Sequence, residues 1–315
     1  MRAGEICILG GTGFVGRHLA AALAAEGRRL RIVSHDPERH RGLRVLPGVE
    51  LLPGDVHDPG TLHHVLEGCD AAINLVGILN ERHRGRDFRA VHVELPRKLV
   101  ETCREIGIRR VLHMSALHAD PARGSSAYLR SKGEGEDLTH LAAGQGLRVT
   151  SFRPSVIFGP DDRFVNRFAE LLRRAPGVFP LACPDARFAP ICVGDVVEAF
   201  RRCLDARMSY GARYELCGPR EYTLRELVVF IAGALGLRRR VIGLGDRLSR
   251  LQARVLERIP GRPFTYDNYL SLRTDSVCGN SALSRLGIVP TAIETVVLYY
   301  LWAARSGSLD RYRHR

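Results

Sequence analysis

This sequence has very little lysine and no long apolar run. Lys98 and Lys132 are the only lysines among 47 cationic side chains, so nearly all of the positive charge is arginine. The longest apolar run, 296–304, ends at Arg305 and is far shorter than the roughly 18 to 20 residues of a transmembrane helix. The N-terminal strand-like run also lacks the longer apolar region of a signal peptide. We therefore expect a soluble, cytoplasmic protein without a transmembrane segment.

Cysteine motifs are absent as well. None of the eight cysteines forms a C-x-x-C pair or joins a histidine cluster, which argues against a metal site and against a disulfide framework. Nearly all of them lie inside apolar runs, so the simplest interpretation is buried free thiols in a reducing compartment. The cysteines occupy positions 7, 69, 103, 183, 192, 203, 217 and 278.

The overall composition is that of an ordinary globular chain. In 315 residues, 45% hydrophobic and 26% charged side chains allow a large buried core and exclude disordered, collagen-like and coiled-coil chains. The formal net charge of +13 suits an anionic membrane face, an acidic partner or a phosphorylated cofactor. No helix-turn-helix, RNA-recognition or zinc-finger pattern accompanies this charge, so we expect no nucleic-acid binding.

The first half of the chain alternates apolar strand-like runs with helical patterns, which is typical of a parallel sheet covered by helices. Predicted strands cover 5–9, 30–34, 49–52, 71–76, 110–114 and 147–152, and predicted helices cover 15–26, 59–66, 88–106 and 128–143. The predicted fold class is therefore α/β, a Rossmann-type doubly wound parallel sheet.

Beyond Arg153 the pattern becomes irregular and rich in proline, which predicts a smaller C-terminal, substrate-side lobe. We expect an NAD(P)-binding Rossmann domain over 1–152, and a lobe over 153–315 with segments that return to the Rossmann sheet. Within the lobe, 245–259 is predicted to be a basic amphipathic helix. Packing of its apolar stripe on the lobe is the simpler interpretation, and a membrane-surface role is the alternative. The stripe consists of Leu248, Leu251, Val255 and Ile259.

A glycine-rich turn, Gly10-Gly11-Thr12-Gly13-Phe14-Val15-Gly16, joins the first predicted strand to the first predicted helix. In a G-x-x-G-x-x-G turn of this kind, the first glycine permits the tight turn and the second lets the backbone approach a pyrophosphate. The third allows the helix to pack closely on the strand, and the helix N-terminus faces the anion. The turn predicts a dinucleotide-binding site.

The end of the second predicted strand bears on the choice of dinucleotide. NAD-selective proteins place an acid here, about 20 residues beyond the glycines, to bind the ribose hydroxyls. This chain has Ser34 and His35, with Arg39 close behind, and these side chains suit a 2′-phosphate. Asp36 is the counter-argument, although an Asp-Pro pair is typical of the start of a turn. NADP(H) is favoured over NAD(H).

Tyr128 and Lys132 lie four residues apart, on one face of a predicted helix. A neighbouring ammonium favours the phenolate, so the pair can act as a general acid or base near neutral pH. One of only two lysines falls in this motif, where a compact amine is poorly replaced by a forked guanidinium. Ser115 ends the preceding strand, and its hydroxyl either polarises a substrate carbonyl or simply caps the strand end.

Together these segments resemble the short-chain dehydrogenase/reductase superfamily, in particular its extended and atypical branches of the NAD-dependent epimerase/dehydratase type. The matching segments are Gly10 to Gly16, Gly54-Asp55-Val56, Asn74-Leu75-Val76-Gly77, Ser115, Tyr128 to Lys132 and Arg153 to Pro160. Longer stretches at 73–79, 128–132, 153–169 and 286–294 look most like the nucleotide-binding accessory subunit of respiratory complex I (alpha-subcomplex subunit nine) and its bacterial relatives.

The resemblance implies a role for each matching segment. The Gly10–Gly16 loop, including Thr12, Gly13, Phe14 and Val15, would hold the pyrophosphate. Asp55 and Val56 would contact the adenine, and Leu75, Val76 and Gly77 would border the ribose and nicotinamide. Lys132 would hold the nicotinamide ribose. The segment that would flank the carboxamide is Pro154, Ser155 and Val156.

Two departures from the superfamily pattern bear on function. Ser115 is followed by Ala116 where many members carry paired serines, and Ser34 replaces the acid of NAD-dependent members. One hypothesis is that the chain is an NAD(P)(H)-binding protein associated with respiratory complex I or with ubiquinone metabolism. Such a protein would lie peripherally on the inner face of the cytoplasmic membrane. The resemblance implies a structurally held nucleotide for it. The alternatives are a freestanding oxidoreductase or epimerase that uses Tyr128, Lys132 and Ser115, and a nucleotide-sensing regulator.

Overall fold

The computed structural model describes residues 4–81 and 87–305, which form two compact units. The first unit comprises Met1–Pro154 and Val196–Glu215, and the second comprises Ser155–Asp195 and Leu216–Arg315. The segment 196–215 therefore returns from the later half of the chain to the first unit. Among the described residues, no helix has the length and hydropathy of a transmembrane segment.

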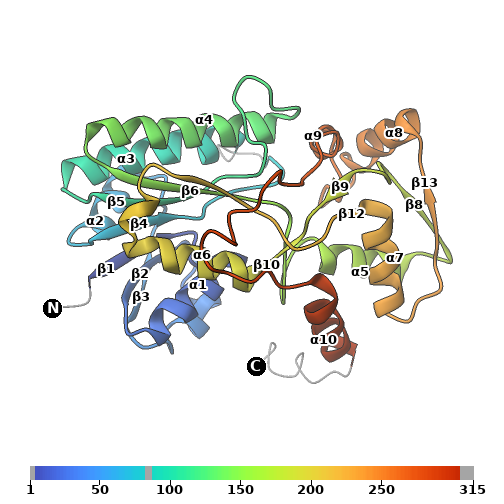
Figure 1. Ribbon diagram of the computed structural model, residues 1–315, viewed down its shortest axis with the longest axis horizontal. Coiled ribbons are helices and arrows are strands. Elements are labelled where there is room, and N and C mark those ends of the chain that lie inside the picture. The colour runs from blue at the N-terminus through green and yellow to red at the C-terminus, as the bar shows by residue number, and fades with distance from the viewer. Residues whose placement is uncertain (1–3, 82–86, 306–315) are drawn as a thin grey trace. The chain divides into compact units, whose positions relative to one another are not determined.

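A seven-stranded sheet forms the centre of the first unit, in the order β11-β6-β5-β4-β1-β2-β3 (Figure 1). The strands are β1 (Glu5–Leu9), β2 (Arg29–Ser34), β3 (Val49–Pro53), β4 (Ala71–Asn74), β5 (Arg110–Met114), β6 (Arg148–Pro154) and β11 (Arg213–Leu216). All pairs among β1 to β6 are parallel. This confirms the predicted fold class and adds β11, a strand that the sequence did not predict.

Helices cover both faces of this sheet because its strands are apolar on both sides. In Figure 1, α3 and α4 lie on one face and α1 and α6 on the other. The buried side chains of β1, α2 and α3 form one apolar core around Cys7, Leu62 and Leu99. The helices of this unit are α1 (Phe14–Ala25), α2 (Pro59–Leu66), α3 (Leu95–Glu105), α4 (Ala127–Leu141) and the greater part of α6 (Val193–Asp205).

The predicted helix over 88–106 is two elements. A π-helical segment, η2 (Ala90–Glu94), precedes α3, and Pro96 lies in the first turn of α3. Two glycines of α4 allow η2 and a neighbouring loop to approach closely. A Cβ on Gly135 would lie 1.7 Å from the carbonyl oxygen of His92, and a Cβ on Gly133 would lie 2.6 Å from the amide nitrogen of Asp120. Both glycines follow Lys132 on α4: Gly135 lets His92 lie against the helix, and Gly133 does the same for the loop at Asp120.

The second unit is built from short strand pairs and helices around its own apolar core. Parallel pairs join β7 (Ile157–Phe158) to β10 (Ile191–Cys192) and β8 (Val178–Leu181) to β13 (Arg240–Gly243). β9 (Arg187–Phe188) and β12 (Tyr222–Thr223) pair in antiparallel fashion. The helices are α5 (Val165–Arg174), α7 (Leu224–Ala234), α8 (Asp246–Leu256), α9 (Tyr266–Ser271) and α10 (Ile293–Arg305). Buried side chains of α5, α7 and α10 share one core.

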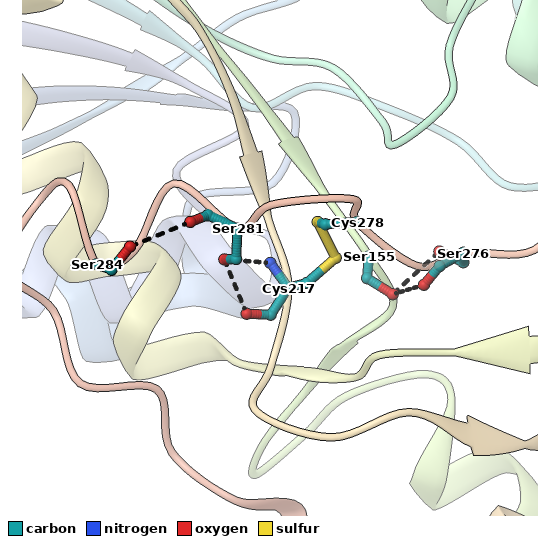
Figure 2. The surroundings of a disulfide bond; sticks show 6 residues. All are labelled: Ser155, Cys217, Ser276, Cys278, Ser281 and Ser284. Atoms are coloured by element: carbon teal, nitrogen blue, oxygen red, sulfur yellow. Dashed lines mark hydrogen bonds between the residues drawn. A yellow bond between two sulfur atoms is a disulfide. The ribbon is translucent and has the colours of Figure 1, made fainter.

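A disulfide between Cys217 and Cys278 lies in this second unit (Figure 2). The expectation of free thiols is wrong for this pair, because the two residues are 61 positions apart and nothing in their local sequence indicates the contact. Hydrogen bonds reinforce the same connection: the Ser281 hydroxyl accepts from the amide of Cys217 at 3.1 Å and donates to its carbonyl at 3.1 Å. The other six cysteines are free, and all but Cys183 are buried.

The predicted amphipathic helix over 245–259 forms as α8, which ends at Leu256 and leaves Ile259 outside it, and the apolar stripe does not pack on the lobe. Leu248, Leu251, Val255 and Ile259 are all exposed, so the interpretation of the stripe as a docking face is wrong. The helix contacts its unit through a different side, because the two residues that it buries most completely are Ser249 and Ala253.

Candidate functional site

The glycine-rich turn lies between β1 and α1 and is too tightly packed for side chains. Gly10 has φ +79°, and a Cβ there would lie 3.0 Å from the backbone carbon of Leu75. A Cβ on Gly16 would lie 2.3 Å from the carbonyl oxygen of Gly10, and one on Gly13 would lie 3.1 Å from the same oxygen. No side chain caps the N-terminus of α1, and its first turn carries no acidic residue. This cradle fits a dinucleotide pyrophosphate.

The exit of β4 stands beside this turn because β1 and β4 are neighbours, at the point where the strand order reverses. Asn74 shapes the exit by accepting a hydrogen bond from the amide of Val76 at 3.1 Å. Leu75 and Val76 are half-buried, and Gly77 is exposed. A Cβ on Gly77 would lie 3.5 Å from Nζ of Lys132, so the predicted ribose and nicotinamide segment and the lysine are brought together.

The end of β2 carries basic side chains and one carboxylate, Asp36, which is bonded within the turn. The buried Ser34 hydroxyl accepts from the amide of Asp36 at 3.2 Å, and the Asp36 carboxylate accepts from the amide of Arg39 at 3.2 Å. Asp36 is therefore engaged in the turn. Burial lowers the pKa of His40, the charges of Arg17 and Arg39 lower it further, and the Asp36 carboxylate partly offsets these effects.

The loop after β3 is ordered by its own aspartate. The Asp55 carboxylate accepts from the amide of His57 at 2.9 Å and lies 3.6 Å from Nε2 of His35. Val56 is buried in the core beneath α2. The structure thus brings Asp55 beside His35, while the side chain of Val56 points into the protein interior.

Lys132 is held inside the first unit by a backbone contact. Its Nζ donates to the carbonyl of Met114, at the end of β5, over 2.7 Å, and only 4% of the residue is exposed. Burial lowers the pKa of this amine to about 8, and the neighbouring Glu136 partly offsets that effect. The ammonium therefore predominates at neutral pH, but it loses its proton far more readily than an ordinary lysine.

Tyr128 is half-buried in an aromatic cluster with Phe88 and His92. Its ring meets the His92 ring edge-to-face, with centroids 5.5 Å apart. Nε2 of His92 accepts from the amide of Ile78 at 3.1 Å, and Nδ1 lies 2.9 Å from the Ser131 hydroxyl, which itself donates to the Tyr128 carbonyl. These partners require the Nδ1–H tautomer. Burial, then Lys132 and His113, lowers the pKa of His92 to about 2, so the imidazole is neutral.

Ser115 is bonded to a buried carboxylate. Its hydroxyl donates to Glu136 at 2.7 Å, and Glu136 is fully buried on α4. Nε of Arg153 contacts both carboxylate oxygens at 2.9 and 3.0 Å, and Nε of Arg213 lies 3.6 Å away. Two guanidinium groups and a hydroxyl thus compensate the buried charge. In this geometry the Ser115 hydroxyl is already used, and its role toward a substrate stays a prediction.

The predicted carboxamide segment falls at the boundary of the two units. Pro154 ends β6 in the first unit, whereas Ser155 and Val156 belong to the second. The Ser155 hydroxyl donates to the carbonyl of Ser276 at 2.6 Å (Figure 2), and Val156 packs against the core of the second unit.

Sequence reasoning missed His92, Glu136 and the structural use of Arg153. Glu136 had a usable signal, because it lies four residues beyond Lys132 and therefore on the same face of the helix. His92 had no usable sequence signal, because a histidine among the apolar residues of a helix does not by itself indicate a functional site. Its position beside Tyr128 depends on the π-helical segment.

A parallel doubly wound sheet, a glycine cradle after β1 and a Tyr-x-x-x-Lys pair on α4 define a dinucleotide-binding protein of the short-chain dehydrogenase/reductase type. The chain belongs to the NAD-dependent epimerase/dehydratase family, whose profile matches residues 6–217.

The relatives of this chain carry names of two kinds, a reductase and a subunit of NADH dehydrogenase. The chain is 32% identical to a ceramide reductase of Caulobacter vibrioides over 77% of this chain and 74% of that one. It is 30% identical to the mouse NADH dehydrogenase [ubiquinone] 1 alpha subcomplex subunit 9, over 72% of this chain but only 60% of the subunit. Among solved structures, MoeE5 in complex with UDP-glucuronic acid and NAD shares the fold with a TM-score of 0.76, at 21% identity over 96% of this chain and 100% of that one.

Proposed function

We propose that this chain retains NADP(H) in the Gly10–Gly16 cradle and serves a respiratory complex I or quinone-linked assembly at the inner face of the cytoplasmic membrane. The observation that carries the proposal is the hydrogen bond from Ser115 to Glu136. It leaves the site without a free serine hydroxyl at the end of β5, where Ala116 follows. A site that binds the nucleotide but has no serine hydroxyl available to a substrate is suited to retaining the nucleotide rather than to turning a substrate over. The 30% identity to the mouse subunit supports the choice of assembly.

The preference for NADP(H) rests on the end of β2. Arg17 and Arg39 both act electrostatically on His40 there, and one oxygen of the Asp36 carboxylate accepts from the amide of Arg39. A 2′-phosphate gains charge-assisted hydrogen bonds in such surroundings. The uncharged ribose hydroxyls of NAD(H) would gain no ionic contact with these cations, and the Ser34 hydroxyl already accepts from the amide of Asp36.

The test is the identity of the nucleotide that leaves the protein. The full chain is purified without added nucleotide, denatured and analysed by mass spectrometry, and we expect near-stoichiometric NADP(H). Arg39→Ala should weaken NADP(H) binding about tenfold with little effect on NAD(H), because one charge-assisted contact is lost. Arg44→Ala is the matched control, since Arg44 is paired with Glu38. An empty protein that exchanges NAD(H) freely contradicts the proposal.

A second candidate function is a freestanding NADP(H)-dependent oxidoreductase or epimerase. It is favoured by the intact pair of Tyr128 and Lys132 and by the similarity to a ceramide reductase. The bound nicotinamide would supply hydride chemistry at a carbonyl or hydroxyl carbon. Tyr128 would exchange the proton of the substrate oxygen, and the Lys132 ammonium would stabilise the phenolate.

For this candidate, Tyr128→Phe is expected to lower turnover by about 10² or more while nucleotide binding stays intact, because the proton donor is removed and the ring is kept. NADPH oxidation is measured with quinone-like, isoprenoid and other lipid carbonyl compounds. Tyr299→Phe is the control, since that tyrosine is 75% exposed on α10. Equal rates in Tyr128→Phe and the unmodified protein refute the oxidoreductase.

A further inference from the structure

The exposed stripe of α8 is an apolar surface that the second unit leaves uncovered. Leu248, Leu251, Val255 and Ile259 are 55, 57, 50 and 44% exposed. Leu248, Leu251 and Val255 recur at three- and four-residue spacing and therefore share one face of α8, whereas Ile259 follows three residues beyond the end of the helix. On the preceding strand β13, Ile242 is also exposed, at 42%. Large aliphatic side chains gathered in this way on one helix indicate a contact surface.

The orientation of α8 is fixed by contacts on another side of the helix. The buried Ser249 hydroxyl accepts from the amide of Cys183 at 3.1 Å and donates to the carbonyl of Leu244 at 3.1 Å. Gln252 donates to the carbonyl of Pro180 at 3.2 Å, and Ala253 is fully buried. At the start of the helix, Asp246 accepts from the hydroxyl of Tyr269 on α9. The stripe therefore faces outward because polar and small residues seat the helix.

Arginines line one flank of the stripe. At 100° per residue, Arg247, Arg254 and Arg250 occupy the sector of α8 beside Leu251, and Arg258 follows two residues after the end of the helix. All four are exposed. Residues 246–262 hold five arginines against one aspartate and one glutamate. An apolar face bordered by long cationic side chains matches the boundary between acyl chains and anionic headgroups, where arginine extends its charge toward phosphate.

The apolar area is small for a protein partner. A stable protein interface buries about 800 Å² on each side, whereas four half-exposed aliphatic side chains present much less. The same area is sufficient for an interfacial helix, whose binding adds electrostatic attraction to shallow apolar burial. We propose that α8 docks this protein on an anionic phospholipid bilayer, with its apolar stripe in the interface and its arginines at the lipid phosphates. The inference supplies the membrane contact that the proposed function requires.

The test is sedimentation of the full chain with vesicles. We expect binding to phosphatidylcholine vesicles that contain phosphatidylglycerol, at least about tenfold weaker binding to phosphatidylcholine alone, and a decrease as salt is raised. Leu251→Gln with Val255→Gln should weaken binding about tenfold or more, because uncharged polar groups replace the inserted side chains. Arg247→Gln with Arg258→Gln should weaken binding to the anionic vesicles only.

Val229→Gln with Leu298→Gln is the matched control, since these residues are 52 and 49% exposed on α7 and α10 of the same unit. This variant should bind like the unmodified protein. Equal binding by the α8 variant and the control overturns the proposal. The proposal is also overturned if the protein sediments only with membranes that contain other proteins. The same holds if the protein does not bind vesicles but self-associates, and the α8 variant abolishes that self-association. Nucleotide retention is measured in parallel: its loss with vesicle binding intact refutes the proposed function alone.

Discussion

Replacement of Gly16 by alanine is expected to weaken dinucleotide binding by about 10²-fold or more. The added Cβ would lie 2.3 Å from the carbonyl oxygen of Gly10 and 2.6 Å from Cα of Gly11. Both are backbone atoms, so the turn itself must move. A displaced turn loses hydrogen bonds from its amides to the pyrophosphate, each contributing about 1.5 to 3 kcal/mol. The measurement is titration of NADP(H) and NAD(H), followed by protein fluorescence or calorimetry.

Gly144→Ala is the matched control for this substitution. Gly144 belongs to the same unit, and a Cβ there would meet no atom within 4 Å. The control should bind nucleotide like the unmodified chain. Circular dichroism establishes that the Gly16→Ala protein is folded. Unchanged affinity in folded Gly16→Ala protein would show that the nucleotide does not lie against this turn.

Reduction of the Cys217–Cys278 disulfide is expected to lower the free energy of unfolding of the second unit by about 4 kcal/mol. The bond closes a loop across 61 positions, and its chief effect is to restrict the unfolded chain. A loss of this size lowers the unfolding midpoint by roughly 10 °C in a unit of this length. The measurement is thermal unfolding of the full chain with and without dithiothreitol.

The variant Cys217→Ala with Cys278→Ala should unfold like the reduced protein and should not respond to dithiothreitol. Cys103→Ala removes a buried free thiol, so it should retain the response to the reductant. An unfolding midpoint of the unmodified chain that does not depend on dithiothreitol would mean that the two cysteines are not bonded in solution.

Much of the site was predictable because its signals are local. The spacing of Gly10, Gly13 and Gly16 between a strand and a helix is a property of seven consecutive residues, and the structure places a tight cradle there. Tyr128 and Lys132 share a helix face by their spacing alone. The partner of Ser115 is different. Glu136 lies 21 residues away, and the contact exists only because α4 packs over the end of β5.

In the second unit, too, local patterns were predictable and contacts between segments distant in the sequence were not. Helical periodicity predicted α8 and the four residues of its apolar stripe. It did not predict that Ser249 and Ala253 would be the buried edge, because that depends on which carbonyl and amide groups of β8 and its flanking loop the helix meets. The cysteines gave no pairing signal, since Cys278 reaches Cys217 only after the chain has passed through α7, α8 and α9.

The α/β class, the glycine cradle and the Tyr-x-x-x-Lys pair could be predicted from the order of residues alone. These features depend on hydrophobic periodicity and on backbone requirements within a few residues. The folded chain was needed to show that β11 is the segment that joins the sheet and that His92 and Glu136 lie beside the pair. It was also needed to show that Cys217 is bonded to Cys278 and that the stripe of α8 faces outward. Each of these results from contacts between distant segments, whose energies depend on how the whole chain packs.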